Sequence, residues 1–229
     1  MTLVSDIVRQ ALRETNIAAL PQPSSTAETT EGLDRLQALV LSTLGNDVGY
    51  IMEDWNVISA ALITDASGVP LSAAMATAFV TPPNVRFACG LTAATTLKLD
   101  PQPQDGQRFS FVDVANTFDS FALTINPNGR KLEGAVGSAV YSTEGLVRQF
   151  MYRSDVADWK KIDTLALGDT FPFPADFDDY FIISLAMRLN PRYAKQLSKE
   201  STERLEQQRG QIIARYSQTR LSAAQPAGG

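Results

Sequence analysis

Two carboxylates in the stretch MYRSDVADWKKI, residues 151–162, are the side chains best placed by type and spacing to do chemistry. Asp155 and Asp158 lie three residues apart and are interleaved with two aromatic rings, Tyr152 and Trp159. A carboxylate pair is the acid–base equipment of enzymes that cleave polysaccharides, including those of bacterial cell walls. Rings mixed with basic residues can also stack single-stranded bases. The alternative is structural: the stretch ends a β-strand, and Trp159 packs over the rim of the sheet.

Other catalytic or metal-binding equipment is scarce. The chain has no histidine, which removes the commonest general base and metal ligand. Its single cysteine, Cys89, lies in the apolar run VRFACGL and is expected to be a buried structural thiol. Asp176, Asp178 and Asp179 follow Pro174, so they fit a first helical turn better than a calcium loop, which needs a glycine at a fixed place. The sequence predicts no enzyme activity, no cofactor and no metal.

Composition narrows the class of protein. With 229 residues, 44% of them hydrophobic, the chain can bury a core of its own. A net charge of −5 argues against gripping a phosphate backbone, which needs a basic surface. No apolar run reaches the roughly 18 residues that would span a membrane, and the first residues lack the apolar centre of a signal peptide. We expect a protein that is made in a cytoplasm and stays soluble.

Helical periodicity is strongest at the two ends of the chain. The first segment, residues 2–16, has an apolar stripe at helical spacing. Ser25 and Glu28 form a capping-box signature, so a second helix is expected from there to about Leu44. A third helix follows Pro174 and should stop at the Asn-Pro pair 190–191.

A fourth helix, about residues 198–221, is strongly charged and has a narrow apolar stripe. Its stripe contains Leu205, Ile212, Ile213 and Tyr216. The stretch SAAQPAGG that ends the sequence has nothing with which to build a core and is expected to be a mobile tail. We interpret this helix and tail as a segment that becomes ordered on a partner.

The middle of the chain has the pattern of β-structure. Turn signals recur between about residues 78 and 161, and period-2 alternation, as at Phe109 and Phe111, predicts strands with one solvated face. NPNG (126–129) and TEG (143–145) resemble hairpin tips, because Asn and Gly accept positive φ at little cost.

The fold class expected from this order is α+β: a four-helix domain built from both chain ends, with an inserted antiparallel β-sandwich or barrel-like domain. The predicted parts are a helical hairpin at 1–47, a connecting segment at 48–77, the β-domain at 78–165, a second helix pair at 166–222 and a flexible tail at 223–229.

Three stretches of the sequence resemble one family of virus proteins. LVSDIVRQALRETNI…EGLDRLQALV resembles the opening helices of the head-to-tail adaptor proteins of short-tailed bacteriophages, also called connector or tail accessory factors. FPFPADFDDYFIISLAMRLNPRYAKQLSKE resembles their second helix pair. The middle stretch, from PPNVRF to FMYRSDVADWKKI, is similar to β-modules inserted in phage adaptor and tail proteins. The resemblance covers most of the chain except about residues 46–77, and the β insertion departs from the smallest, all-helical members.

The resemblance implies a structural virion protein of the neck. It implies a ring, usually of twelve subunits, assembled in the host cytoplasm and seated between the portal protein and the tail nozzle or hub protein. Such a ring seals the packaged DNA, and double-stranded DNA passes through its channel without specific binding. No membrane is involved.

Contact residues are predicted at two places. The portal interface is assigned to the last helix, at Ile212, Ile213, Arg215, Tyr216 and Arg220. A contact with the tail or a neighbouring subunit is assigned to Tyr152, Arg153 and Trp159. A chain cut after about Gln211 is then expected to fold but not to join portal rings. The alternatives are a cell-wall or polysaccharide-active phage protein using the β-domain carboxylates, and another tail or head-completion component.

Overall fold

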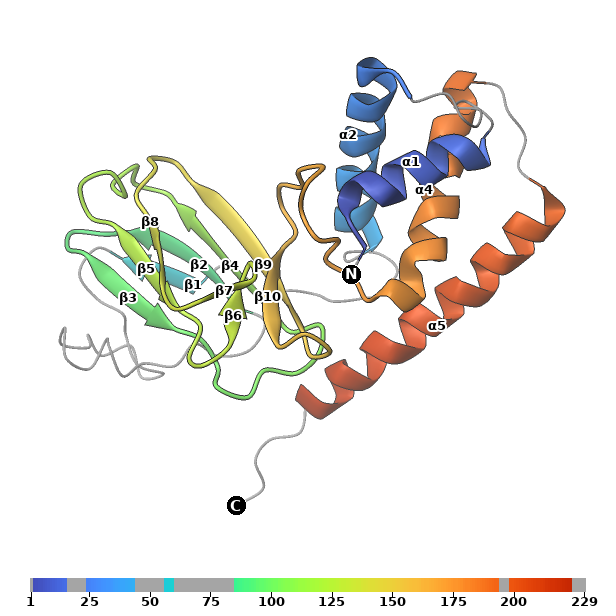
Figure 1. Cartoon of the computed structure of the whole chain (residues 1–229). Coiled ribbons are helices and arrows are strands. Elements are labelled where there is room, and N and C mark those ends of the chain that lie inside the picture. Colours follow the sequence, from blue (N-terminus) through green and yellow to red (C-terminus); the bar gives the residue numbers. More distant parts are fainter. Residues whose placement is uncertain (1, 16–23, 44–55, 60–84, 194–197, 224–229) are drawn as a thin grey trace. The chain divides into compact units, whose positions relative to one another are not determined.

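A computed structural model of the chain describes residues 2–15, 24–43, 56–59, 85–193 and 198–223. It contains helices and mixed β-sheets, so the α+β class is confirmed. The chain divides into two compact units (Figure 1): a helical unit, Met1–Tyr50 with Thr164–Gly229, and a β unit, Ile51–Asp163. Most of the predicted connecting segment, 48–77, and nearly all of the tail lie outside the described residues.

Helices α1 (Val4–Glu14) and α2 (Thr26–Ser42) form where the sequence predicts them. The capping box of α2 is confirmed, because Glu28 N donates to Ser25 Oγ at 3.3 Å and Ser25 N donates to the Glu28 carboxylate at 2.8 Å. The buried stripe of α1 consists of Val4, Ile7, Val8, Ala11 and Leu12. These apolar side chains fix which face of α1 packs into the unit.

The contact between α1 and α2 depends on a glycine. A Cβ added to Gly32 of α2 would lie 2.6 Å from Val8 Cγ1 of α1. Carbon atoms do not approach so closely, so a side chain at this position would require Val8 or the helices to shift. Gly32 therefore sets how closely the two helices pack.

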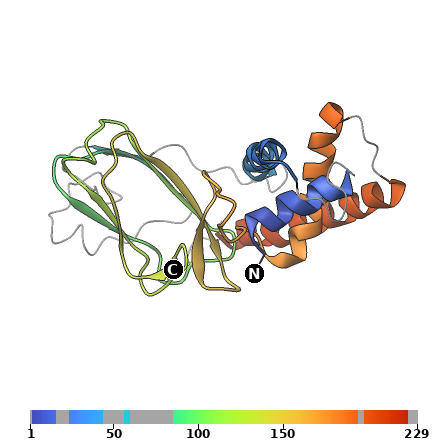
Figure 2. The same cartoon turned by 45° about the horizontal axis from the view of Figure 1, so that its top comes forward.

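Helix α4 (Asp178–Tyr193) follows the short 3-10 turn η2 (Ala175–Phe177) and packs against α1, α2 and α5. The predicted stop at Asn190-Pro191 is wrong, because the helix continues to Tyr193. Proline removes one backbone donor and disfavours a helical residue before it, yet the helix tolerates this near its end. Figure 2 shows α4 crossing α1 within the helical unit.

Helix α5 (Lys199–Ala223) packs along α4. Its buried stripe is narrow, as the sequence predicts, and consists of Ser201, Leu205, Ile212 and Tyr216. Ile213, which the sequence places in the same stripe, is 39% exposed. Neighbouring helical residues point about 100° apart, so Ile212 and Ile213 cannot both face α4.

The β unit contains two sheets within its described residues. The larger sheet has the order β1-β2-β4-β9-β10-β6-β7, with β1 at Asn56–Ser59, β2 at Val85–Gly90, β4 at Arg108–Asp113, β9 at Val147–Arg153, β10 at Asp158–Lys161, β6 at Lys131–Leu132 and β7 at Ala135–Val136. The smaller sheet has the order β3-β5-β8, with β3 at Thr95–Lys98, β5 at Leu123–Asn126 and β8 at Ala139–Tyr141. Figure 2 shows strands of the two sheets on opposite sides of this unit.

The prediction of antiparallel sheets is wrong, because both sheets are mixed. β2 pairs with β4 in parallel, and β3 pairs with β5 in parallel, whereas β4–β9 and β5–β8 are antiparallel. The chain crosses from one sheet to the other between β2, β3, β4 and β5. Between β2 and β4 the chain passes through β3 of the other sheet and reverses direction twice, so β2 and β4 are parallel. The same holds for β3 and β5, which are separated by β4.

The predicted turns form, but they do not close hairpins. Asn128 and Gly129 have φ of 54° and 85°, and Gly145 has φ of 67°. The turn at 126–129 joins β5 to β6, and the turn at 143–145 joins β8 to β9, so each connects the two sheets. Hairpins occur instead at β6–β7 and β9–β10. Local φ preferences identify a turn but not the sheet to which the next strand belongs.

The core of the β unit is aromatic and contains side chains from both sheets. Its buried members are Phe87, Cys89, Leu91, Leu97, Leu99, Phe109, Phe111, Phe118, Leu123, Ile125, Leu132, Phe150, Tyr152 and Trp159. The alternation of Phe109 and Phe111 is confirmed as an inward-facing pattern. The expectation of a solvated opposite face is wrong for β4, where Arg108 and Ser110 are 5% and 0% exposed.

Candidate functional site

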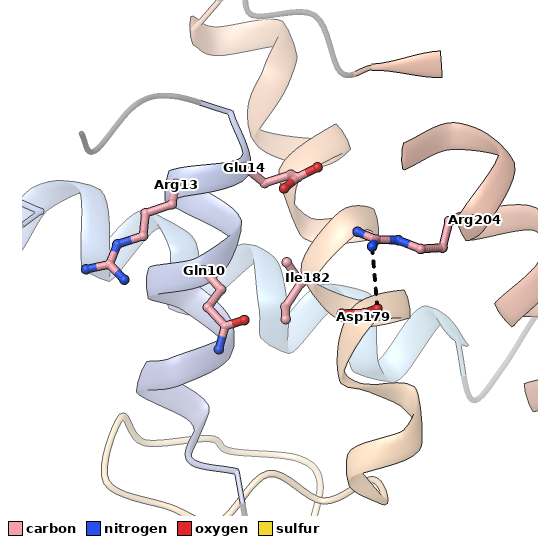
Figure 3. Close-up of a pocket in the computed structure, with 6 residues that line it drawn as sticks. All are labelled: Gln10, Arg13, Glu14, Asp179, Ile182 and Arg204. Carbon is pink, nitrogen blue, oxygen red and sulfur yellow. Dashed lines mark ion pairs between the residues drawn. The ribbon is translucent and has the colours of Figure 1, made fainter. Parts of the chain in front are cut away.

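The helical unit has a surface groove with a volume of 410 Å³. It is lined by Gln10, Arg13 and Glu14 of α1, Asp179 and Ile182 of α4, and Arg204 of α5 (Figure 3). Three helices that are distant in sequence therefore supply one polar concave surface. The sequence alone does not predict this groove, because no spacing within one helix reveals which residues of the other helices lie beside it.

The charges in this groove are balanced and solvated. Arg204 Nη1 lies 3.9 Å from Asp179 Oδ2, and both side chains are about half exposed. Glu14 Oε1 accepts a hydrogen bond from Ser201 Oγ at 2.6 Å. Figure 3 shows the Arg13 side chain pointing away from the Arg204–Asp179 pair. Solvated charges of both signs can recognise a polar partner.

Most of the predicted portal residues are used inside the helical unit. Ile212 is 0% exposed, and Tyr216 is 1% exposed with its ring 6.2 Å from the rings of Phe173 and Phe177. The Arg215 guanidinium lies over the Phe177 ring at 5.5 Å. Ile212 and Tyr216 therefore pack α5 against the rest of the helical unit, and their assignment to a portal interface stays a prediction.

Ile213 keeps an accessible side chain on α5, and its exposure is consistent with a contact surface. The side chain of Arg220 lies outside the described residues, although its backbone belongs to α5. The cut after Gln211 would remove both Ile212 and Tyr216. The structure therefore favours a cut farther along the helix as a test of partner binding.

The stretch MYRSDVADWKKI is the β9–β10 hairpin. Tyr152 and Trp159 are cross-strand partners, and their ring centroids lie 5.3 Å apart. They are 4% and 1% exposed, and Arg153 is 4% exposed. All three side chains, predicted to contact the tail or a neighbouring subunit, are thus buried within the β unit, and their contact with another chain stays a prediction. Trp159 does not cover the rim of the sheet, since it lies within β10 and faces the core.

Each carboxylate of this hairpin has a cationic partner. Asp158 Oδ2 lies 2.6 Å from Lys160 Nζ, and Asp158 Oδ1 accepts from Gly134 N at 3.1 Å. Asp155 pairs with the Arg153 guanidinium through two hydrogen bonds. These contacts stabilise the hairpin and its neighbour β6–β7. Both carboxylates are thus engaged in contacts within the β unit.

The second acidic group lies where a helix begins. Asp178 and Asp179 are in the first turn of α4, and Asp176 is in η2. Asp178 accepts a hydrogen bond from Thr2 Oγ1. Their positions agree with the interpretation as N-terminal acids, which interact favourably with the helix dipole.

Cys89 is a buried thiol, as predicted. It is 0% exposed in the core of the β unit. Burial, and next the negative charge of Asp113, raise the pKa of the thiol to about 12. Since the thiolate is the reactive form, Cys89 is protected from alkylation and oxidation in the folded protein.

Asp113 is a residue with a role that the sequence analysis missed. It is 3% exposed, and its carboxylate accepts from Thr117 N and Phe118 N, each at 3.1 Å. It also accepts from Gly145 N at 3.2 Å. One buried carboxylate thus fixes the loop after β4 and the turn before β9.

A second feature that the sequence analysis missed is a set of exposed valines. Val136 of β7 is 84% exposed, Val140 of β8 is 63% exposed and Val147 of β9 is 40% exposed. The segment from Ala135 to Thr143 contains no charged residue. Edge strands usually carry charges, so the lack of charge in Ala135–Thr143 is the signal in the sequence that could have identified this segment as a sheet edge without charged residues.

Within the described part of the chain, no group of three or more His, Cys, Asp or Glu side chains is arranged to hold a metal ion. No helix of that part is long and apolar enough to cross a membrane.

Comparison with known proteins gives no family. No protein-family model matches the chain, and a search of curated proteins found no significant match. The adaptor resemblance therefore rests on the sequence stretches quoted above.

Proposed function

We propose that this protein is a structural subunit of a virion head-to-tail adaptor. It forms a ring, of twelve subunits in the family that it resembles, between the portal protein and the tail nozzle or hub protein. The ring seals the packaged DNA and carries the attachment surface for the tail. In this proposal a four-helix domain made from both ends of the chain forms the ring, and the β unit is an insertion in it.

Helix α5 is the observation that supports this proposal most directly. It has 25 residues, and it is held to the unit by a narrow stripe of side chains. Exposed residues such as Glu203, Glu206 and Arg209 line the rest of its described surface. A long helix attached along one stripe offers its remaining faces to another chain.

The charge of the chain supports the proposed path of the DNA. A net charge of −5 disfavours lasting contacts with phosphates. A subunit of this charge suits a channel through which double-stranded DNA slides. A DNA-gripping clamp would instead require a basic stripe along its inner face.

The proposal is tested by shortening α5 without disturbing its packing. A chain ending at Ser217 retains Ile212 and Tyr216, so we expect it to fold with the thermal stability of the full chain. We expect it to lose binding to purified portal rings, measured by co-sedimentation. A matched pair is Ile213→Glu and Gln207→Glu, since both add an acid at an exposed position of α5.

The expected outcome is that Ile213→Glu weakens portal binding while Gln207→Glu does not. Full binding by the chain ending at Ser217 would contradict the assignment of this interface. Failure of the full-length chain to bind any portal ring would contradict the adaptor function itself. An image of the virion that locates the protein at the neck, or elsewhere, decides between an adaptor and another tail or head-completion component.

A further inference from the structure

The outer strands of the smaller sheet of the β unit are β3 and β8. The order of the strands is β3-β5-β8, and within the described residues no strand pairs with the outer side of β3 or of β8. An open edge presents a row of backbone N–H and C=O groups that can pair with another strand. Natural proteins usually protect such edges with charged residues or proline.

Most of the length of these two edges lacks that protection. Ala135–Thr143, which contains β8, has no charged residue or proline, and β3 has a single charge, at its last residue, Lys98. The chain as a whole has a net charge of −5, so identical copies carry like net charge and repel each other weakly at long range. The edges of β3 and β8 are places where two copies can meet without bringing like charges together.

The directions of the strands allow one copy to continue the sheet of the next. β3 is parallel to β5, and β5 is antiparallel to β8, so β3 and β8 run in opposite directions. Placed beside β8 in the same orientation, the β3 strand of another copy would pair with it antiparallel. Antiparallel pairing is slightly more stable per residue than parallel pairing.

The outer face of the sheet also continues across such a contact. Thr96, Thr124 and Val140 are register partners across the three strands. Val140 is 63% exposed and Thr96 is half-buried. Threonine and valine are β-branched residues that pack well as cross-strand neighbours. A row continuing from Val140 to the partner's Thr96 would therefore extend one uncharged surface from subunit to subunit.

We propose that copies of this chain join through β8 of one subunit and β3 of the next, antiparallel, with Val140 opposite the partner's Thr96. The contact uses two different surfaces, so repetition of it generates a ring or an open chain of subunits. This inference rests on the proposed function, because it assumes that the chain assembles into a ring. By this inference the β unit is a site of subunit contact in addition to the helical unit.

Disulfide trapping tests this register. In an antiparallel pair the Cβ atoms of opposite residues lie roughly 4.5–5.5 Å apart, within the range of a disulfide. Within one subunit, β5 separates Thr96 and Val140 by two strand spacings, roughly 9.5 Å, which is too far. Cys89 can stay in place because it is buried.

The double variant Thr96→Cys/Val140→Cys is expected to form a ladder of covalent multimers on mild oxidation, seen on a non-reducing gel. The single variants are expected to remain monomeric. The control pair Thr96→Cys/Val114→Cys carries its second thiol at a position that is 58% exposed but outside β8, and should also give no ladder. Val140→Lys should abolish the multimers formed by the unmodified chain, whereas Val114→Lys should not.

Trapping is done both on free protein and on protein bound to portal rings. The inference is wrong if the double variant gives no more multimers than the control pair in both states, or if Val140→Cys alone gives dimers. In the first case, binding of the same protein to portal rings would leave the adaptor function intact. A ladder in a protein that never binds portal rings would support the strand contact and contradict the adaptor function.

Discussion

The helical unit and the β unit use glycine for opposite reasons. Gly32 of α2 is required for its missing volume, because a Cβ there would meet Val8. Gly129, Gly134 and Gly137 of the β unit have no atom within 4 Å of such a Cβ, but their φ values are +85°, +84° and +116°. Helix packing is therefore limited by space, whereas the connections of the sheets are limited by backbone conformation.

The cores of the two units also differ, in the size of the side chains that fill them. Helix α1 contributes small and medium aliphatic side chains, which allow it to approach α2 closely. The two sheets instead enclose a cluster of large rings that includes Phe109, Phe111 and Phe150. Sheets pack about 10 Å apart, so large side chains are needed to fill the space between them. The comparison predicts that each unit responds to a different kind of substitution.

The largest expected effect is the loss of an aromatic ring from the β core. Phe111 is 0% exposed and contacts the rings of Phe118, Tyr141 and Phe150. We expect Phe111→Ala to lower the free energy of unfolding of the β unit by about 3–5 kcal/mol. Hydrogen exchange measured by mass spectrometry should show lost protection in β4 and β9. Labelling of Cys89 by a thiol reagent at pH 8 should accelerate in parallel.

The reciprocal control is Phe181→Ala in α4, whose ring is also 0% exposed. It should lower protection in the helical unit and leave the labelling rate of Cys89 unchanged. If both variants lower protection equally in both units, the two units unfold as one, and the comparison fails.

A smaller effect is expected where the helices touch. Gly32→Ala should destabilise the helical unit by about 1–3 kcal/mol, since overpacking costs more than the gain in helix propensity. Thermal unfolding measures the change. Gly210→Ala in α5 is the matched control: nothing lies within 4 Å of its added Cβ, so we expect stabilisation of up to about 1 kcal/mol.

The steric explanation is checked by the pair Val8→Ala/Gly32→Ala. Removal of the Val8 methyl groups should recover much of the cost of Gly32→Ala, so the two effects should not add. Additive losses in the double variant would contradict the close approach of α1 and α2.

Substitution of a turn glycine in the β unit should cost less and for a different reason. Gly134 lies in the β6–β7 hairpin with φ of +84°. Gly134→Ala is expected to destabilise the β unit by about 1–2 kcal/mol, because an L-residue is strained at this φ. Gly134→Asn should cost less in the same chemical denaturation experiment, since Asn tolerates positive φ. Equal costs for both variants would point to a lost contact rather than to strain.

The smallest expected effect is a gain. Ala157, in the turn between β9 and β10, has φ of 51°, an unfavourable conformation for alanine. Ala157→Gly relieves this strain but makes the unfolded chain more flexible, so we expect a net stabilisation of about 0.5–1 kcal/mol. Ala135→Gly, in β7, is the control and should destabilise. Equal effects of the two variants on the denaturation midpoint would contradict strain at Ala157.

Local signals in the sequence were sufficient to locate the helices, although not the end of α4. The capping box at Ser25 and Glu28, the stripe of α1 and the acids at the start of α4 act over one or two turns of helix, so a single segment contains them. The inward alternation at Phe109 and Phe111 is local in the same sense. The charge-free segment that contains β8 was also readable, although its meaning depends on its place at an edge.

The tertiary structure alone decided which strands are neighbours and which polar side chains are buried. The turns at 126–129 and 143–145 were correctly located, but sheet membership depends on hydrogen bonds between strands far apart in sequence. The burial of Tyr152, Arg153 and Trp159 depends on cross-strand pairing in β9 and β10, and the burial of Tyr216 depends on Phe173 and Phe177. Thus the sequence by itself determined the element types, the turns and the α+β class, because these follow from preferences of neighbouring residues. Only the fold decided which residues remain on the surface, because burial depends on contacts between distant segments.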